Sequence, residues 1–150
     1  MLTNSKTQDS VLDDARLILE TIPRSMRHVR THVREAAGVD FTTPQYRVLS
    51  KIARESSTVS ELAEWMGVRP PTMSRMVDAL VSKKLVARGS REETGDRRQI
   101  RLRATARGAK QVAAIRASTQ RELAKRMAQL TDAQRRSLRA GLAVLKELFG

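Results

Sequence analysis

The 150-residue sequence contains no cysteine, and this absence excludes several chemistries at once. Without thiols there are no disulfides, no thiolate metal sites and no cysteine-based catalysis or redox sensing. Long apolar runs are also absent, so the sequence predicts no membrane span. The first ten residues, MLTNSKTQDS, are polar and do not resemble a signal peptide. We therefore expect a cytoplasmic protein that does not enter a membrane.

Aromatic residues are scarce, at 3% of the chain: Phe41, Tyr46, Trp65 and Phe149. Proteins that grip single-stranded nucleic acid usually stack its bases on aromatic rings. The most basic part of this chain, residues 69–110, has no aromatic residue. Duplex DNA is held by phosphate contacts and by side chains that read the grooves, so it needs no such platform.

Groups for catalysis or metal binding are equally few. The chain has no glycine-rich phosphate loop and no convincing carboxylate pair, so we expect neither an enzyme nor a cofactor. His28 and His32 are four residues apart on one predicted helix face, a spacing that a metal pair can use. A third ligand would have to be a carboxylate such as Glu35. Coincidence explains the spacing better, and we expect no metal site.

Positive charge is what the chain has in excess, with 29 Lys and Arg against 16 Asp and Glu, a net charge of +13. Residues 1–68 carry no net charge, because their basic and acidic side chains are equal in number. Residues 69–110 carry 12 basic and 4 acidic side chains, net +8, and residues 111–150 carry 8 and 3, net +5. A focused positive zone indicates a polyanionic partner, whereas dispersed charge would serve solubility equally well.

Helical periodicity dominates both ends of the chain. Apolar residues recur every three or four positions from Val11 to Ala36, after a start over residues 1–9 that we expect to be disordered. Pro23 predicts a kink or a break near Ile22, and Gly38 ends the helix. A second long helix of about 24 residues begins at Thr105, and a last helix follows the capping box of residues 131–134. Stripes this long need a partner, either within the chain or from a second copy.

The pattern in the middle of the chain indicates a helix-turn-helix. Thr43 is a plausible N-cap with Pro44 at the first position of a helix. The segment TVSELAEWMG opens with a capping box and ends on a glycine turn, and RPPTMSRMVDALVSKKL follows as a second helix. This second helix exposes one face, which contains Pro71, Thr72, Ser74, Arg75, Asp78 and Ser82. The alternative is an ordinary corner between two helices.

Two stretches in which apolar and polar residues alternate, LVARGS and QIRLR, then predict a basic β-hairpin. The loop REETGDRR, residues 91–98, lies between them, with Gly95 placed for a tight turn. A helix-turn-helix followed directly by such a hairpin is a winged helix. The combination favours DNA binding far more than either half does.

The whole arrangement resembles the MarR family of bacterial transcription regulators over roughly residues 11–149. The most specific motifs are SRMVDAL…KKLVAR and Asp96-Arg97-Arg98, followed by Thr105 and Gly108. The chain departs from the family at Ala104, where leucine is usual, and at Lys84, where glycine is usual. The resemblance implies a mainly α (α+β) fold: a single domain, residues 1–150, with a winged helix-turn-helix lobe (residues 42–103) and dimerisation helices (residues 11–37 and 105–149).

The resemblance also implies a function. It implies a homodimer that binds a palindromic operator in double-stranded DNA, that usually represses transcription, and that often releases DNA when a small aromatic or phenolic ligand enters a pocket between the dimer helices and the DNA-binding lobe. His28 and His32 are candidates for that pocket, since a position on the first helix borders it in the family, or for the dimer helices. Tyr46 and Trp65 are further candidates that would stack on an aromatic effector, or they belong simply to the core.

Candidate DNA contacts fall in three places. On the second helix of the helix-turn-helix and just before it, they are Arg69, Thr72, Ser74 and Arg75, where the alternative for Arg75 is a pair with Asp78 or a wing acid. The helix start at Thr43 to Gln45 offers a second phosphate site. In the wing, Arg91 and Arg97 are candidates for the minor groove or flanking phosphates, and Arg98 either binds phosphate or braces the wing against Asp96. Glu92 and Glu93 would repel phosphate, so we expect them to point away from the duplex or to pair with an arginine.

Two other functions compete with a sequence-specific regulator. One is a nonspecific architectural protein that binds nucleic acid through charge alone, and the other is a scaffold whose basic helices bind another protein. A regulator should prefer its own upstream region over bulk DNA by about a thousandfold or more, and an architectural protein should not.

Overall fold

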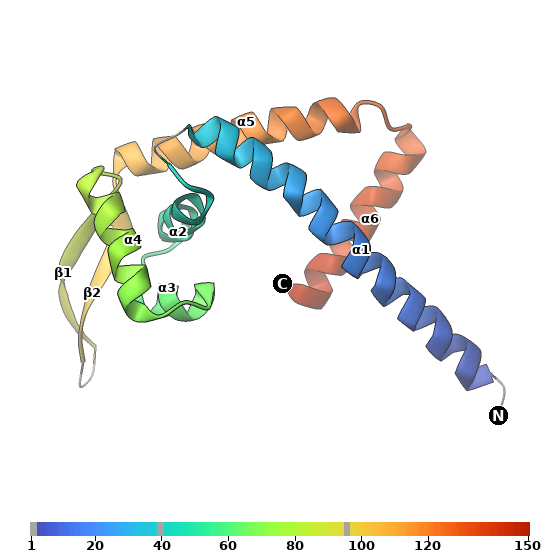
Figure 1. The fold of residues 1–150 in the computed structure, drawn as a ribbon, viewed down its shortest axis with the longest axis horizontal. Helices are drawn as coiled ribbons and strands as arrows, with labels where there is room; N and C mark the ends of the chain where they lie inside the picture. The colour runs from blue at the N-terminus through green and yellow to red at the C-terminus, as the bar shows by residue number, and fades with distance from the viewer. Residues whose placement is uncertain (1–2, 39–40, 95–96) are drawn as a thin grey trace.

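The computed structural model describes residues 3–38, 41–94 and 97–150, and the side chains of residues 8–38, 41–89 and 100–150. In these ranges the elements are α1 (Thr3–Ala37), α2 (Thr43–Arg54), α3 (Val59–Met66), α4 (Pro70–Ser82), β1 (Val86–Thr94), β2 (Arg97–Ala104), α5 (Ala106–Met127) and α6 (Asp132–Phe149). Figure 1 shows α2, α3, α4 and the sheet gathered in a lobe at one end of the molecule. The long helices α1, α5 and α6 extend away from this lobe.

Helix α1 is longer and more regular than the sequence suggests. The predicted disordered start is wrong from Thr3 onward, because helix begins there. The predicted interruption near Ile22 is not a break, since the helix continues through Pro23. Proline cannot donate a hydrogen bond to the carbonyl of Leu19, but Leu19 is 74% exposed, so water can satisfy that carbonyl. Gly38, with φ +78°, follows the helix as predicted.

The three short helices begin and end at residues whose side chains or backbones complete the hydrogen bonding. The predicted N-cap at Thr43 is wrong by one residue: Thr42 caps α2 and forms a capping box with Gln45. Thr58 and Glu61 form the predicted capping box of α3. Gly67 ends α3 with φ +68°, a conformation that disfavours side chains with a Cβ. Arg69 is the N-cap of α4, whose two prolines occupy its first turn as expected.

The predicted hairpin is present and is longer than expected. Strands β1 and β2 pair antiparallel from Val86 opposite Ala104 to Thr94 opposite Arg97, with a register shift between Arg88 and Arg91. Most of the segment 91–98 is therefore strand, and the prediction of a loop over all of it is wrong. Gly95 and Asp96 lie outside the described residues. An isolated bridge between Ser57 and Leu102 joins the base of the hairpin to the start of α3.

The core lies inside the lobe and extends to α1 through Val33 and to α5 through Ile115. Its fully buried side chains come from α2, α3, α4, β2 and α5: Val48, Leu49, Leu62, Met73, Val77, Leu80, Leu102 and Ile115. Helix α5 packs on α1, α2 and β2, and it buries Gly108, Ile115 and Thr119. This contact fixes the start of the long α5 helix to the lobe.

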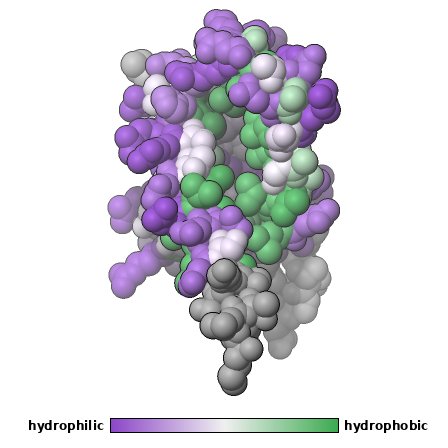
Figure 2. Space-filling view, turned by 90° about the vertical axis from the view of Figure 1, so that its right-hand side faces the viewer, coloured by the Kyte–Doolittle hydropathy of each residue, from purple (hydrophilic) through white to green (hydrophobic). Residues whose placement is uncertain are grey.

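The far ends of the long helices expose apolar side chains. Helix α6 has no buried residue in the described structure, and Leu142, Leu148 and Phe149 are more than half exposed. Val11, Leu12 and Leu19 are also more than half exposed on α1. Figure 2 looks at this end of the molecule and shows apolar side chains in two bands beside a hollow, with hydrophilic side chains outside. Exposed apolar faces of this kind are typical of surfaces that another molecule covers.

Candidate DNA-binding surface and effector cavity

The N-terminal half of α4 presents one polar face to solvent. Thr72 and Arg75 are exposed and Ser74 is half-buried, while Met73 and Val77 turn into the core with no exposure. Arg69 is exposed just before the helix, and its side chain makes no capping hydrogen bond. The sequence-predicted contacts of this region are therefore together on one surface.

Arg75 does not take the alternative partner Asp78. The carboxylate of Asp78 instead accepts a hydrogen bond from the guanidinium of Arg88 at the base of β1. Among the described side chains, no carboxylate forms an ion pair with Arg75. The alternative of a pair between Arg75 and a wing acid concerns Glu92, Glu93 and Asp96, whose side chains lie outside those that the structure describes.

The start of α2 forms a second patch with polar groups. Thr42 Oγ1 accepts a hydrogen bond from the Gln45 backbone at 3.3 Å, and Gln45 Oε1 accepts one from the Thr42 backbone at 3.0 Å. The side-chain oxygen of Gln45 is thus used in the cap, which leaves its amide NH2 as the donor for another ligand. Thr43 is half-buried beside it.

The wing carries the remaining predicted contacts in its strands. Arg91 lies opposite Ile100, Arg97 opposite Thr94, and Arg98 opposite Glu93. This register concerns the backbone alone, because the side chains of residues 90–99 lie outside those that the structure describes. Whether Glu92 and Glu93 point away from DNA or pair with an arginine stays a prediction. Asp96, the predicted brace, lies outside the described residues.

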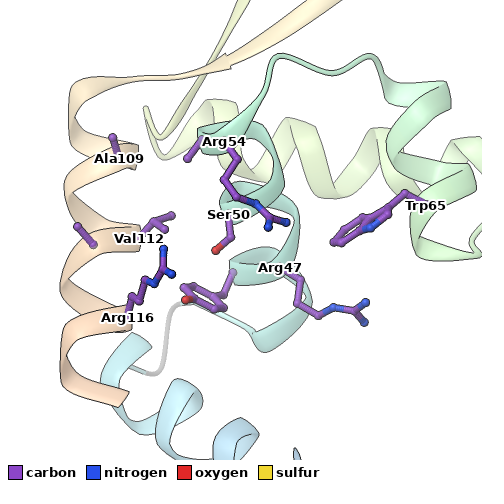
Figure 3. A pocket seen from close by; sticks show the side chains of 10 residues that line it. Arg47, Ser50, Arg54, Trp65, Ala109, Val112 and Arg116 are labelled. Carbon is purple, nitrogen blue, oxygen red and sulfur yellow. The ribbon is translucent and has the colours of Figure 1, made fainter. Parts of the chain in front are cut away.

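A cavity of about 530 Å³ opens between α2, α3 and α5. Two of the predicted effector residues, Tyr46 and Trp65, are in its lining. The lining also contains residues that the sequence did not single out: Arg47, Ser50, Ala53, Arg54, Ala109, Val112, Ala113 and Arg116. Figure 3 shows Arg116 reaching from α5 toward Ser50 on α2, with Arg47 and Trp65 on the other side of α2. The cavity thus combines apolar, aromatic and cationic walls.

The charges around this cavity are unbalanced. The guanidinium of Arg47 lies 5.3 Å from the centre of the Trp65 ring, and the ammonium of Lys51 lies 5.8 Å from it. Lys51 donates a hydrogen bond to the carboxylate of Glu55. This hydrogen bond holds the pKa of Glu55 below its usual value. No ion pair with a described carboxylate neutralises Arg47, Arg54 or Arg116.

Ser50 adds an unused polar group to the same wall. Its Oγ is buried and has no hydrogen-bond partner among the described residues. A buried hydroxyl without a partner costs free energy, so a bound molecule that hydrogen-bonds to it would gain affinity. Arginines and a hydroxyl beside an aromatic ring suit a small aromatic anion.

The two histidines lie elsewhere on α1. Neither His28 nor His32 is in the lining of the cavity, and His32 Nδ1 lies 3.2 Å from Glu35 Oε2 one turn along the helix. Across the described part of the chain, no three His, Cys, Asp or Glu side chains are grouped as a metal ion would require. The same residues include no helix that is both long and apolar enough to cross a membrane.

Sequence comparison relates the chain to known proteins. Residues 39–99 match a model of the MarR family. The HTH-type transcriptional repressor MdtR of Bacillus subtilis (strain 168) is 35% identical over 104 residues, which are 69% of this chain and 64% of MdtR. The matched segment therefore spans less than two thirds of the length of that relative.

Solved structures extend the similarity to the long helices. The YusO protein of Bacillus subtilis superposes with a TM-score of 0.67 and 28% identity, covering 93% of this chain and 96% of YusO. The RV1404 protein of Mycobacterium tuberculosis has a TM-score of 0.70 over 99% of this chain and 95% of its own, at 24% identity. At that identity the second likeness establishes the fold alone. Both support one arrangement of lobe and long helices along nearly the whole chain.

Proposed function

Because the chain belongs to the MarR family of winged helix-turn-helix transcription regulators, we propose that it binds a specific site in double-stranded DNA and represses transcription. The observation that carries this proposal is the exposed N-terminal face of α4 beside a two-stranded wing, within a segment of net charge +8. A helix of this kind enters the major groove, while basic residues beside it contact phosphates. Repression is the activity named for the relative MdtR.

The proposed contacts fall into two groups: those that read the DNA bases and those that hold the DNA backbone. Thr72, Ser74 and Arg75 meet base edges or nearby phosphates, and an arginine that grips guanine bidentately contributes about 1–3 kcal/mol of discrimination. Arg69 and the start of α2 at Thr43 and Gln45 contact the backbone, because helix N-termini favour phosphate. Arg91, Arg97 and Arg98 of the wing bind the flanking minor groove or its phosphates.

A second copy of the chain is the proposed partner of the exposed apolar faces on α1 and α6. The early part of α1 carries Asp9, Asp13, Asp14 and Glu20, while α6 carries Arg135, Arg136 and Arg139. Opposite charges on two apolar helices favour their association between copies. A two-fold dimer would present two α4 helices to a palindromic operator.

The cavity between α2, α3 and α5 is the proposed effector site. A small aromatic molecule with a negative charge fits it, since the ring would stack near Trp65 and the anion would meet Arg54 or Arg116. The cavity borders both α5 and the helix-turn-helix, so a ligand that separates α2 from α5 would move the lobe relative to the long helices. We propose that this movement lowers DNA affinity.

Competition between DNAs tests the proposal. A labelled duplex from the region upstream of the coding sequence is bound at moderate salt and challenged with unlabelled bulk DNA. We expect a preference of about a thousandfold or more for the upstream duplex, and a footprint with two symmetric halves. Equal competition by bulk DNA would favour the alternative of a nonspecific architectural protein. The absence of any DNA binding would favour a protein scaffold.

A further inference from the structure

One ion pair connects the helix that faces DNA to the wing. Arg88 Nη2 at the base of β1 donates a hydrogen bond to Asp78 Oδ1 on α4, although ten residues separate them in the sequence. Their side chains are 47% and 60% exposed. No other ion pair between described side chains joins α4 to the sheet.

Arg88 is the last residue before the register of the wing shifts. The strand pairing is regular from Val86 to Arg88 and shifts between Arg88 and Arg91, as at a β-bulge or a similar irregularity. Bulges bend a strand and increase its local twist. A Cβ on Gly89 would lie 3.1 Å from the Arg101 carbonyl oxygen, so the two strands also approach closely at this point. The ion pair therefore holds the last residue before the register shift.

The opposite strand is fixed at the same level. Leu102 is 1% exposed and its backbone N–H donates to the Ser57 carbonyl at 2.9 Å. Arg101 Nη1 donates to the Ser56 carbonyl at 3.2 Å. Strand β2 is thus attached to the segment before α3, and strand β1 is attached to α4 through Arg88. Together these contacts determine the angle at which the wing leaves the lobe.

Asp78 also shares the polar face of α4 with Ser74 and Arg75, one turn earlier. An unpaired carboxylate there would repel DNA phosphates. The guanidinium of Arg88 neutralises it, and the same bond occupies a guanidinium that would otherwise be free for phosphate.

We propose that Asp78 and Arg88 are a positioning pair that fixes the angle between α4 and the wing. With this angle fixed, α4 can read the major groove while the wing contacts the flanking DNA. Neither Asp78 nor Arg88 contacts the duplex itself. This inference rests on the proposed DNA-binding function.

The test uses the full chain with the double variant Asp78→Asn/Arg88→Gln, which leaves the net charge unchanged. We expect affinity for the upstream duplex to fall about 3- to 5-fold, as for loss of an exposed ion pair, with the slope against salt unchanged. Protection of the flanks in a hydroxyl-radical footprint should weaken while the centre stays protected. The charge-reversed pair Asp78→Arg/Arg88→Asp should recover the flanks.

The control is Glu122→Gln/Lys125→Gln, which removes an exposed ion pair from α5 and also leaves the net charge unchanged. It should leave affinity and footprint unchanged. If Arg88 instead bound phosphate, the Asp78→Asn/Arg88→Gln variant would lose about one unit of salt slope, which contradicts the proposal. Wild-type affinity in that variant would also contradict it.

A measurement without DNA separates this inference from the proposed function. Because the chain has no cysteine, spin labels can be attached at Ser82→Cys on α4 and Thr94→Cys at the end of β1, in labelled chains diluted with unlabelled ones. The distribution of distances between the labels should broaden in the Asp78→Asn/Arg88→Gln variant. An unchanged distribution overturns the positioning role, whatever the DNA result. A wild-type chain without preference for its upstream DNA overturns the proposed function instead.

Discussion

The hydroxyl of Thr105 donates a hydrogen bond to the carbonyl of Lys84 at 2.8 Å, and so joins the start of α5 to the turn after α4. Lys84 has φ +58°, the one positive φ of a non-glycine residue in the described structure. Thr105 also accepts a hydrogen bond from the Gly108 backbone at 3.0 Å as the N-cap of α5. One threonine therefore connects the long helix to the end of the proposed recognition helix.

Replacing Lys84 with glycine should stabilise the protein. A left-handed backbone costs an ordinary residue about 1–2 kcal/mol, and part of this gain is offset by the greater flexibility of glycine in the unfolded chain. We expect Lys84→Gly to raise the free energy of unfolding by about 0.5–1 kcal/mol, measured by urea denaturation at fixed protein concentration. Lys83→Gly is the control, because Lys83 has φ −78° and should lose stability instead. A destabilised Lys84→Gly variant would contradict the reasoning.

Replacing Gly108 with alanine should destabilise the contact between α5 and the lobe. A Cβ at this position would lie 2.1 Å from the Leu85 carbonyl oxygen, which is backbone and cannot turn aside. We expect a loss of about 1–3 kcal/mol in the same denaturation measurement. The neighbouring exposed substitution Lys110→Ala should change stability by less than about 0.5 kcal/mol. Equal stability of the two variants would mean that α5 does not approach the turn this closely.

Removing Arg97 should weaken binding to all DNA sequences. It lies in β2 opposite Thr94, near the end of the wing, where we propose contact with phosphates or the minor groove. We expect Arg97→Ala to flatten the slope of log affinity against log salt by about one unit. Arg126→Ala makes the same change of charge at an exposed position on α5 and should leave the slope unchanged. An unaltered slope in Arg97→Ala would remove Arg97 from the set of DNA contacts.

A charge placed in the exposed apolar stripe of α6 should separate the two copies. Leu142 is 53% exposed in the single chain, and a second copy would bury it. We expect Leu142→Glu to shift the sedimentation of the protein from dimer to monomer, because an unpaired carboxylate is costly to bury. Ala143→Glu, turned by about 100° around the helix, is the matched control and should remain dimeric. A wild-type chain that sediments as a monomer would overturn the proposed partner.

The sequence predicted elements whose signals are local, and it missed relationships between distant segments. The capping box of Thr58 and Glu61 and the turn at Gly67 are each contained in a few residues, and the structure confirms both. The cap of α2 was placed one residue late because two threonines precede Pro44, and only the reach of the side chain to Gln45 selects Thr42.

Partners far apart in the sequence left no such signal. No spacing rule brings Arg88 to Asp78, or places Arg116 of α5 and Ser50 of α2 in the lining of one cavity, since the packing of different elements determines both arrangements. Pro23 illustrates the reverse case. Its local signal predicts an interruption of the helix, which the structure does not show as a break. The carbonyl of Leu19, to which proline cannot donate a hydrogen bond, is at an exposed position on α1, so water can satisfy it.

Trp65 should report directly on the proposed effector. It is the only tryptophan of the chain and lines the cavity, so its fluorescence should change when an aromatic carboxylate such as benzoate binds, while uncharged benzyl alcohol should have little effect. We expect Arg116→Ala to weaken benzoate binding about 10- to 100-fold, the usual loss for a charge-assisted hydrogen bond.

Arg107→Ala, outside this cavity, provides the control for the loss of a positive charge on α5. It should bind benzoate as the wild type does. The same titration carried out on the DNA complex should release the upstream duplex from the wild type at benzoate concentrations that leave the Arg116→Ala complex intact. If benzoate changes the fluorescence of Trp65 but never releases DNA, the cavity binds aromatic anions without regulating the lobe. If benzyl alcohol binds as well as benzoate, the arginines do not select the ligand.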